Sequence, residues 1–416
     1  MSSIVLKRGR DSSVRRFHPW IFSGAIARID GSPGEGEVVE VFSHDRELLG
    51  YGHYQEGSIA VRLLDFGSEP MQTTFWLDKL KQAYNLRVAS GVLNSSDCYR
   101  LVHGEGDSLP GLIIDFYNGV AVIQAHSAGM FLSLRDIAGA LRALYGDSLK
   151  SVYDKSSGTA PFKAGLELSD GYLIDDSSGV WRREVNDEKR GEGEDGPDGV
   201  IVSENGHLFN IDWEKGQKTG FFLDQRDNRA LLKSYSKGRR VLNLFSYTGG
   251  FSIYSLAGGA LSVDSVDSSK RAVELMDMNV AINRERSVID RKTVHRSHCA
   301  DVMTFMKECP VSGYDLVIVD PPAFAKHRGA LSNALRAYRR LNASVIEKIA
   351  PGGVIFTFSC SQVVEKSMFA EAIFSAAAQT GRSVRIVGRM TQPADHPVSI
   401  YHPEGEYLKG MVLYVE

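Results

Sequence analysis

From about residue 200 onward, apolar runs of strand length alternate with helix-spaced segments, and this alternation limits the fold more than any other feature. Strands separated by helices are predicted at residues 240–245, 260–266, 294–299, 314–319 and 353–358. Alternation of this kind is typical of an α/β fold with a doubly wound, mainly parallel sheet. The last two predicted strands, at 384–388 and 411–415, have no clear helix between them, so we expect them to form an antiparallel edge.

The region before residue 200 divides into three parts. Residues 1–70 contain short β-segments separated by Gly, Pro and Asp turn signals, which predict a small β-barrel. Residues 71–180 mix helix-spaced segments with strands, two of them joined by the hairpin signal Asn118-Gly119, and predict a central α+β domain. Residues 181–199 are rich in acids and glycine, so we expect a flexible loop. Residues 200–416 are left for the α/β domain.

Composition excludes several classes of protein. The length of 416 residues, with 43% hydrophobic and 24% charged residues, fits a multidomain globular protein. No apolar run approaches the ~20 residues of a membrane span, and the N-terminus lacks the apolar core of a signal peptide, so a cytoplasmic protein is expected. The four cysteines form no CxxC pair, which argues against a zinc ribbon or an iron–sulfur cluster, and no metal site is predicted.

Basic residues are concentrated in two places, although the net charge is only −3. Residues 7–16 contain five basic residues and one acid. Residues 321–346 contain no acid, and their basic residues are Lys326, Arg328, Arg336, Arg339 and Arg340. Nucleic-acid binding depends on where charge lies rather than on its sum. Each patch is therefore a candidate phosphate-binding surface, and a solvated helix or loop face explains each equally well.

The first strand of the α/β domain leads into the glycine turn Phe245-Ser246-Tyr247-Thr248-Gly249-Gly250, and Asp267 follows the second strand. This is the layout of a nucleoside-binding site, in which the turn approaches the ligand and the acid accepts hydrogen bonds from ribose hydroxyls. The diphosphate of NAD usually requires the spacing G-x-G-x-x-G, which is absent, so S-adenosylmethionine is favoured. Asp301, after the third strand, is placed to meet the adenine amino group, to cap the next helix, or to do both.

Two further signals follow neighbouring strands. Asp320-Pro321-Pro322 comes after the strand at 314–319, and Cys360 comes between two serines after the strand at 353–358. Parallel strands end at one edge of a sheet, where α/β enzymes keep their chemistry. Together the two signals fit the methylation of a nucleic-acid base.

These motifs resemble the bacterial 23S ribosomal RNA cytosine-C5 methyltransferases. The resemblance covers most of the chain and rests on residues 217–226, 245–250, 320–322, 358–361 and 394–397, and on His103-Gly104-Glu105-Gly106-Asp107. It implies a Rossmann-like domain that uses S-adenosylmethionine, and a cytosine in 23S ribosomal RNA as acceptor. The N-terminal segment containing His18-Pro19-Trp20 resembles a PUA domain, a small RNA-binding β-barrel. The acidic stretch before residue 199 is longer than the family leads us to expect.

The chemistry of cytosine C5 assigns roles to two side chains. Because C5 is a poor nucleophile, a thiolate must first add to C6, and Cys360 is the candidate for this covalent step. Asp320 is the candidate for engaging the N3/N4 edge of the base, and it is also a candidate contact of the donor, close to the donor methyl group. The alternatives are a buried structural cysteine and an ordinary Asp-Pro turn. No second cysteine follows the prolines, so a single-cysteine mechanism is expected, and the base that removes the C5 proton is unidentified.

Four other side chains are weaker candidates. Gln225 and Arg226 precede the first strand and are candidate contacts of the donor. Arg226 is expected either to pair with the donor carboxylate or to form an ion pair within the fold. His396 is a candidate helper in catalysis, but a structural role is favoured. Phe324 is a candidate for stacking on a flipped base, with a core position as the alternative.

Two other functions are kept as alternatives. The first is a methyltransferase acting on a guanine nitrogen, for which Cys360 would be dispensable. The second is a catalytically inactive RNA-binding factor in ribosome assembly, which the intact motifs argue against. The sequence leaves open the nucleotide modified, the choice between naked RNA and a large-subunit assembly intermediate, and whether the protein is a homodimer.

Overall fold

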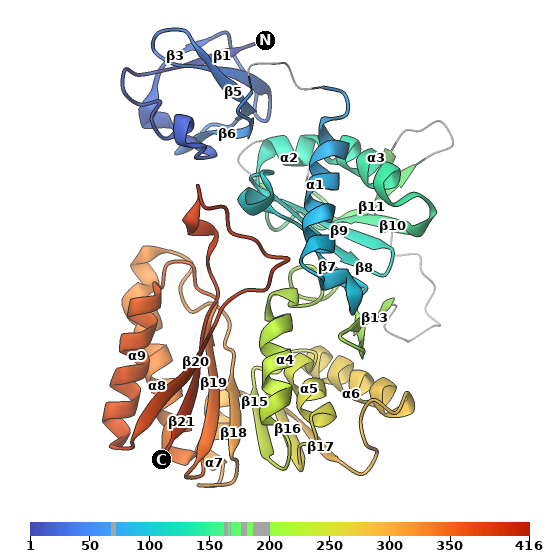
Figure 1. The fold of residues 1–416 in the computed structure, drawn as a ribbon, viewed down its shortest axis with the longest axis vertical. Helices are drawn as coiled ribbons and strands as arrows, with labels where there is room; N and C mark the ends of the chain where they lie inside the picture. The colour runs from blue at the N-terminus through green and yellow to red at the C-terminus, as the bar shows by residue number, and fades with distance from the viewer. Residues whose placement is uncertain (68–71, 162–164, 167, 176–180, 186–199) are drawn as a thin grey trace. The chain divides into compact units, whose positions relative to one another are not determined.

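The structure is a computed structural model, and it describes residues 1–67, 72–161, 165–166, 168–175, 181–185 and 200–416. Contacts divide the chain into two compact units, which are drawn in Figure 1. Unit 1 comprises Met1–Val200, Ile211–Phe221 and Ala394–Gly405, and unit 2 comprises Ile201–Asn210, Phe222–Pro393 and Glu406–Glu416.

The α/β domain is therefore discontinuous in sequence, and does not run without a break over residues 200–416. Residues 211–221 and 394–405 group with unit 1 because buried carboxylates hold them there. Thr219 Oγ1 donates to Asp115 Oδ2 at 2.5 Å, and the Arg100 amide donates to Asp395 Oδ2 at 3.0 Å. A buried carboxylate is costly unless donors satisfy it, so these long-range hydrogen bonds tie both segments to the central strands.

The first sheet of unit 1 contains six strands in the order β2-β6-β5-β4-β1-β3. Apolar side chains that alternate along these strands pack into one hydrophobic core, which includes Ile4, Val39 and Val61. The strands are β1 (Ser3–Leu6), β2 (Trp20–Phe22), β3 (Ile26–Asp30), β4 (Val38–Phe42), β5 (Leu48–Tyr54) and β6 (Ile59–Asp65).

The second sheet of unit 1 also has six strands, in the order β12-β11-β10-β9-β8-β7, and helices α1 and α3 contribute to its core. Asn118 and Gly119 have φ angles of 45° and 98°, so the predicted tight hairpin between β8 and β9 is confirmed. The elements are α1 (Phe75–Ala89), β7 (Cys98–His103), β8 (Leu112–Tyr117), β9 (Val120–Ala125), α2 (Ala128–Leu132), α3 (Leu134–Tyr145), β10 (Ser151–Asp154), β11 (Gly171–Asp175) and β12 (Trp181–Val185).

The predicted acidic loop over residues 181–199 is wrong at its start. Residues Trp181–Val185 form β12, which pairs antiparallel with β11. The ladder supplies backbone hydrogen bonds that composition alone does not reveal. The rest of the predicted loop, residues 186–199, lies outside the described residues.

Unit 2 is built on a seven-stranded sheet in the order β17-β16-β15-β18-β19-β21-β20, which confirms the predicted α/β fold. The first five strands in this order are parallel to one another. Strand β21 pairs antiparallel with both β19 and β20. The strands are β15 (Arg240–Leu244), β16 (Ser262–Asp267), β17 (Val294–Cys299), β18 (Leu316–Val319), β19 (Gly353–Ser359), β20 (Val384–Met390) and β21 (Lys409–Val415). A separate pair is formed by β13 (Val200–Glu204) and β14 (His207–Ile211).

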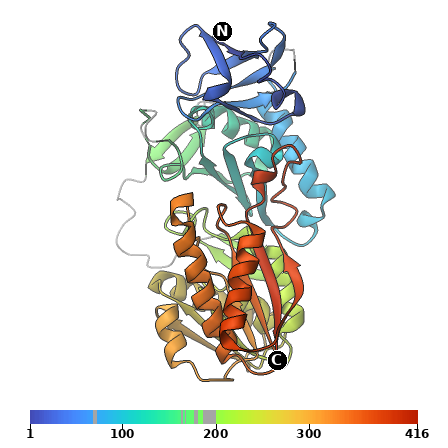
Figure 2. The same ribbon diagram turned by 90° about the vertical axis from the view of Figure 1, so that its left-hand side faces the viewer.

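Helices cover both faces of this sheet, as Figures 1 and 2 show. The central strands β18 and β19 consist entirely of buried residues, as expected for parallel strands covered on two sides. One continuous core joins the sheet to α7, α8 and α9. The helices are α4 (Arg226–Tyr235), α5 (Gly250–Ala257), α6 (Lys270–Glu285), α7 (Val302–Glu308), α8 (Leu331–Lys348) and α9 (Lys366–Thr380).

Candidate functional site

The strand order of unit 2 brings most of the predicted site residues to one edge. Strand β15 lies between β16 and β18, so the direction of winding reverses there. At such a switch point the carboxyl ends of parallel strands are the usual ligand site of an open α/β sheet. The turn after β15, Asp267 at the end of β16, Asp320 after β18 and Cys360 after β19 all lie at this carboxyl edge.

The turn after β15 has an unusual backbone. Phe245, Tyr247 and Gly249 have φ angles of 60°, 46° and 83°, in the left-handed region that non-glycine residues rarely adopt. A Cβ atom at Gly249 would lie 2.6 Å from Met276 Cγ, so a glycine is required at this point. Strained backbone of this kind persists only where the surroundings hold it, and it is frequent at binding sites.

Asp267 is the main support of this turn. Its Oδ2 accepts a hydrogen bond from the Tyr247 amide at 2.8 Å, and its Oδ1 accepts one from the Ser269 amide at 2.9 Å. The turn is also held by the Ser246 amide, which donates to the Val266 carbonyl at 3.0 Å. The predicted pairing of turn and acid is therefore present, whereas the contact of Asp267 with a ribose stays a prediction.

Two hydroxyl groups in the turn fit a polar ligand. Ser246 Oγ and Thr248 Oγ1 are buried, and neither has a hydrogen-bond partner within the part of the chain that the structure describes. A buried hydroxyl without a partner costs about 1–3 kcal/mol. Polar groups of a bound nucleoside or amino acid would satisfy them, so the turn fits S-adenosylmethionine.

Asp320 is joined to α4 by a chain of side-chain amides. Gln225 Nε2 donates to Asp320 Oδ2 at 3.1 Å, and Asn228 Nδ2 donates to Gln225 Oε1 at 2.6 Å. Gln225 and Asn228 are both buried. Gln225 is therefore bound to Asp320, and its predicted contact with the donor stays a prediction. Asn228 was missed because nothing in the local pattern distinguishes it from other polar helix residues.

Arg226 forms an ion pair within the fold, which was one of its two predicted roles. Its Nε lies 3.7 Å from Glu204 Oε2, and Arg229 binds the same carboxylate with Nε and Nη2 at 2.8 and 2.7 Å. All three side chains are buried, and together they carry a net positive charge. Pairing of Arg226 with the donor carboxylate stays a prediction that this charge favours.

Asp301 caps α7, as one of its predicted roles requires. Its Oδ1 accepts hydrogen bonds from the Thr304 amide at 2.8 Å and from Thr304 Oγ1 at 3.0 Å. These hydrogen bonds, the backbone bond first, hold the pKa of this exposed carboxyl below its usual value. The contact of Asp301 with adenine stays a prediction.

Cys360 is brought against the Asp320-Pro321-Pro322 loop. Its thiol donates to the Pro321 carbonyl with a distance of 3.9 Å from Sγ to O, and the side chain is half-buried. Strands β18 and β19 are direct neighbours, which is why their last residues meet. The structure therefore joins the two motifs that the sequence analysis paired.

The two serines beside Cys360 are structural. Ser359 Oγ donates to the Tyr338 hydroxyl at 2.9 Å, and the Tyr338 hydroxyl lies 3.2 Å from Ser361 Oγ. The Ala325 amide donates to Ser361 Oγ at 3.3 Å, which links the cysteine loop to the proline loop. The ring of Phe324 lies 4.8 Å from that of Tyr338, so the structure favours a packing role for Phe324.

Lys409 completes this part of the edge, and the sequence analysis missed it. It lies opposite Ser359 in the β19–β21 ladder, and its Nζ donates to the Ser361 carbonyl at 2.6 Å. Burial lowers the pKa of Lys409 to about 8, which the charge of Cys360 opposes. The only signal in the sequence is a lysine at the start of an apolar strand.

His396 lies in unit 1, where it has a structural setting. Its Nδ1 is 3.0 Å from Asp395 Oδ1, and its ring centroid is 5.0 Å from that of His103. Both His396 and Asp395 are buried. These contacts support the structural role that the sequence analysis favoured.

The two predicted basic patches are exposed. In unit 2 this holds for Lys326, Arg328, Arg336, Arg339 and Arg340, which lie on the proline loop and on α8. In unit 1, Arg15 is bound to Asp11 and Glu47 at 2.6 and 2.5 Å, so part of the N-terminal charge is neutralised. Lys7, Arg8, Arg10 and Arg16 are exposed as well.

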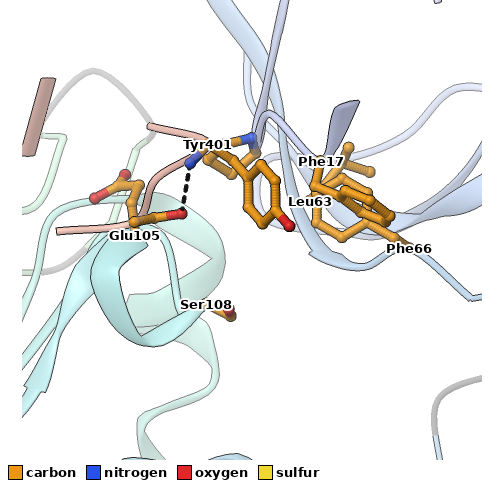
Figure 3. A pocket seen from close by; sticks show the side chains of 8 residues that line it. Phe17, Leu63, Phe66, Glu105, Ser108 and Tyr401 are labelled. Atoms are coloured by element: carbon orange, nitrogen blue, oxygen red, sulfur yellow. Dashed lines mark hydrogen bonds between the residues drawn. The ribbon is translucent and has the colours of Figure 1, made fainter. Parts of the chain in front are cut away.

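Unit 1 contains a small aromatic cavity of about 250 Å³, shown in Figure 3. The ring of Phe17 lies 5.5 Å from that of Phe66 and 5.2 Å from that of Tyr401. About half of the surface of Phe17 and Tyr401 is exposed. Exposed rings of this kind suit stacking of a nucleobase, and hydrophobic packing within unit 1 explains them equally well.

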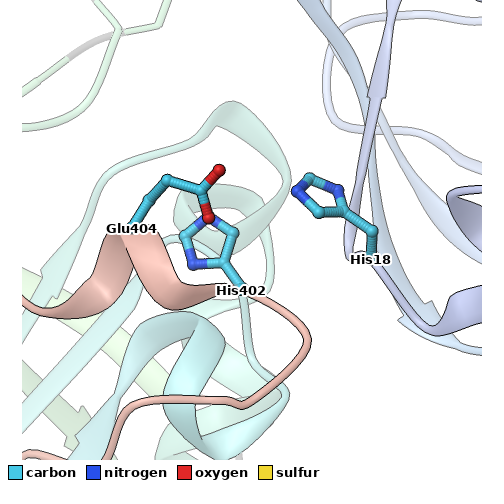
Figure 4. A group of neighbouring side chains, drawn as sticks. All are labelled: His18, His402 and Glu404. Carbon is cyan, nitrogen blue, oxygen red and sulfur yellow. The ribbon is translucent and has the colours of Figure 1, made fainter.

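His18, His402 and Glu404 form a second polar group in unit 1, shown in Figure 4. Their nearest ligand atoms lie within 4.8 Å of one another, and His402 Nε2 is 3.8 Å from Glu404 Oε2. Tetrahedral zinc holds nitrogen and oxygen ligands about 3.4 Å apart. The group is more open than a formed metal site, and the Trp20 ring packs against His402 with centroids 4.3 Å apart.

Comparison with known protein families gives two matches. Residues 189–405 match the family of S-adenosylmethionine-dependent methyltransferases, and residues 4–66 match a PUA-like domain. Both matches agree with the resemblance found in the sequence. No helix among the described residues is long and apolar enough to cross a membrane.

Full-length relatives bear the name ribosomal RNA large subunit methyltransferase I. The protein from Vibrio parahaemolyticus is 36% identical over 417 residues, which cover 100% of this chain and 99% of the relative. The protein from Aeromonas salmonicida is 37% identical over 414 residues, covering 99% and 98%. The protein from Alteromonas mediterranea is 38% identical over 418 residues, covering 100% and 99%.

Solved structures share the fold. A protein from Streptococcus mutans, described as a SAM-dependent methyltransferase, superposes with a TM-score of 0.78 at 22% identity over 100% of both chains. A structure described as a methyltransferase complexed with SAH gives a TM-score of 0.79 at 22% identity, also over 100% of both chains.

Proposed function

The chain belongs to the family of S-adenosylmethionine-dependent methyltransferases that includes ribosomal RNA large subunit methyltransferase I, and from this premise we propose that it methylates C5 of a cytosine in 23S ribosomal RNA. One observation carries the choice of base, namely the contact of the Cys360 thiol with the Pro321 carbonyl. A methyltransferase for a guanine nitrogen has no need of a thiol at this position.

Bound S-adenosylmethionine supplies a methyl group on a positively charged sulfur, which makes that methyl electrophilic. We assign the binding of this donor to the carboxyl ends of β15 and β16, beside the point where the direction of winding reverses. The turn Phe245-Ser246-Tyr247-Thr248-Gly249 offers two buried hydroxyls, those of Ser246 and Thr248, and Asp267 offers a carboxylate. Asp301 and the positive cluster at Arg226 are the proposed contacts for the two ends of the donor.

Cys360 is the proposed nucleophile. Its thiolate adds to C6 of the cytosine, which forms an S–C6 bond and moves the C5=C6 electron pair so that C5 becomes nucleophilic. C5 then takes the methyl group of the donor, whose S–CH3 bond breaks to leave the neutral thioether S-adenosylhomocysteine, and the C5 proton leaves to a base. The electrons of the C5–H bond then restore the double bond, and the S–C6 bond breaks to return the thiolate. The net result is one hydrogen replaced by methyl and one proton released.

Asp320 is the proposed contact for the base. Its carboxyl group is oriented by the hydrogen bond from Gln225 and by the rigid prolines that follow it. In this position it accepts a hydrogen bond from N4 and shares a proton with N3 as charge builds on the ring. In this arrangement the Asp320 carboxylate contacts the N3/N4 edge of the cytosine, and the Cys360 thiolate bonds to C6 on the opposite side of the ring.

The acceptor must be single-stranded or flipped out of a helix, because C6 is not reachable in a base pair. Lys326 and Arg328, exposed on the proline loop, are the proposed contacts for flanking phosphates. We propose that residues 1–70 contribute to RNA binding, with the Phe17–Tyr401 cavity as a stacking surface. The chemistry is assigned to unit 2.

Methyl transfer from labelled S-adenosylmethionine to unmodified 23S ribosomal RNA, followed by nucleoside mass analysis, tests the proposal. We expect 5-methylcytosine from the wild-type protein and none from Cys360→Ala. A methylguanine product that survives Cys360→Ala would contradict the proposal. Activity restricted to an assembly intermediate would change the substrate without changing the chemistry.

A further inference from the structure

A buried lysine lies beside the proposed nucleophile. Lys409 has a relative exposure of 6%, and its Nζ donates to the Ser361 carbonyl at 2.6 Å. Ser361 follows Cys360 directly, and Ser359, which precedes it, is the ladder partner of Lys409. The lysine therefore reaches across the neighbouring strand to the three-residue segment that contains the cysteine.

Burying an ammonium group is costly, and a packing role alone does not explain the choice of lysine. A methionine would fill similar volume without the desolvation penalty. The Ser361 carbonyl needs one donor, and many neutral side chains supply one. What a lysine adds is a positive charge held in a region of low dielectric, where it acts most strongly on nearby groups.

A cation beside a cysteine favours the thiolate, which is the reactive form. Burial lowers the pKa of Lys409 to about 8, so the group is still mostly charged at pH 7, and the charge on Cys360 acts to keep it protonated. Glu406 acts in the same direction, and Lys366 acts against it. Tyr338 and the hydroxyls of Ser359 and Ser361 are neutral hydrogen-bonding groups beside the cysteine. Asp320, on the loop that the Cys360 thiol contacts, is an acid that acts against the thiolate.

We propose that Lys409 is a positioning residue for Cys360, whose ammonium group fixes the backbone after the cysteine and stabilises the attacking thiolate. The inference rests on the proposed function, in which Cys360 is the nucleophile. The thiol proton passes to solvent, and the charge of the resulting thiolate is balanced by Lys409. When the sulfur bonds to C6 it loses its negative charge and with it the attraction to Lys409. The attraction is restored when the thiolate leaves C6.

The test is the pH dependence of Cys360 alkylation by iodoacetamide, measured without RNA or methyl donor. A Cys299→Ser background removes the exposed cysteine, and Cys98 and Cys309 are buried. We expect Lys409→Met to raise the midpoint of alkylation by about one pH unit, which makes the reaction about tenfold slower at pH 7. Lys409→Arg keeps the charge and is expected to restore most of the wild-type midpoint.

Lys366→Met is the matched control. Lys366 also lies near this region, but it is exposed and paired with Glu406 at 2.5 Å, so its loss should leave the midpoint nearly unchanged. An unchanged midpoint in a folded Lys409→Met protein would overturn the proposal and leave Lys409 a structural residue. Because no methyl transfer is measured, a failure here is distinguishable from a failure of the cytosine assignment, which the nucleoside analysis reports.

Discussion

At the carboxyl edge of the unit 2 sheet, the donor side and the cysteine side are held by different means. The proposed donor side, formed by the turn after β15 and Asp267, depends on backbone conformation and on amide hydrogen bonds. The cysteine side, formed by Asp320-Pro321-Pro322 and Ser359-Cys360-Ser361, depends on buried side chains such as Tyr338, Gln225 and Lys409. Binding of the donor should therefore respond to backbone changes, and the chemical step to side-chain changes.

The largest effect is expected from Cys360→Ala, which removes the proposed nucleophile and leaves the turn after β15 and Asp267 unchanged in sequence. Methyl transfer should fall by at least about a thousandfold, because the covalent route is lost. The dissociation constant of S-adenosylmethionine, measured by calorimetry, should stay within about twofold of wild type. Loss of donor binding in this variant would show that the two sides are not separate.

Gly249→Ala should have the reverse effect. The added Cβ would lie 2.6 Å from Met276 Cγ at a φ of 83°, so the turn must shift and donor affinity should fall by about tenfold or more. Gly259→Ala is the matched control, because Gly259 has the same φ of 83° but its Cβ would meet nothing closer than 3.7 Å. Equal donor affinity in the two variants would mean that the close contact with Met276 is irrelevant.

Asp267→Asn and Asp301→Asn separate the two acids of the donor side. Asp267 supports the turn through both carboxylate oxygens, so its loss should weaken donor binding about tenfold. Asparagine caps a helix as well as aspartate does, so Asp301→Asn should keep the stability of α7. A fall of about threefold in donor affinity for Asp301→Asn would reveal the adenine contact, and no change would leave Asp301 only a cap.

The smallest effect concerns stability and pH. Lys409 has a folded-state pKa of about 8 against an ordinary value of 10.5, so between these pH values the unfolded chain binds more protons than the folded one. The free energy of unfolding of the wild type should therefore rise relative to Lys409→Met as pH increases from about 8 to about 10.5. Urea unfolding of both proteins measures this difference, and a flat difference would contradict burial of the charge.

The sequence was sufficient for the sheet and for the pairing of the two motifs. Parallel strands buried on both faces leave long apolar runs, and side chains that follow such runs must meet at one edge. This is why Asp320 and Cys360 were placed together correctly. The turn at Gly249 was equally accessible, because glycine and a following acid are local signals.

Lys409 and the unit boundaries were missed for a common reason. Strand β21 pairs antiparallel with β19, which brings Lys409 beside the segment that contains Cys360 although the two are about fifty residues apart in the sequence. The hydrophobic periodicity of a strand does not reveal which other strand it pairs with. The segments at 211–221 and 394–405 belong to unit 1 through long-range hydrogen bonds, such as those of Thr219 with Asp115 and of the Arg100 amide with Asp395. The acidic composition around β12 favoured a loop, although this segment pairs with β11 as a strand.

The most direct test of the covalent mechanism is trapping of the adduct. A 23S ribosomal RNA transcript made with 5-fluorocytidine cannot lose a proton from C5, so an enzyme that adds through sulfur should remain attached after methyl transfer. Nuclease and protease digestion followed by mass analysis should then find one methylated fluorocytidine on the peptide that contains Cys360. Turnover of the normal RNA with no attachment of the fluorinated RNA, or attachment through another residue, would contradict the account.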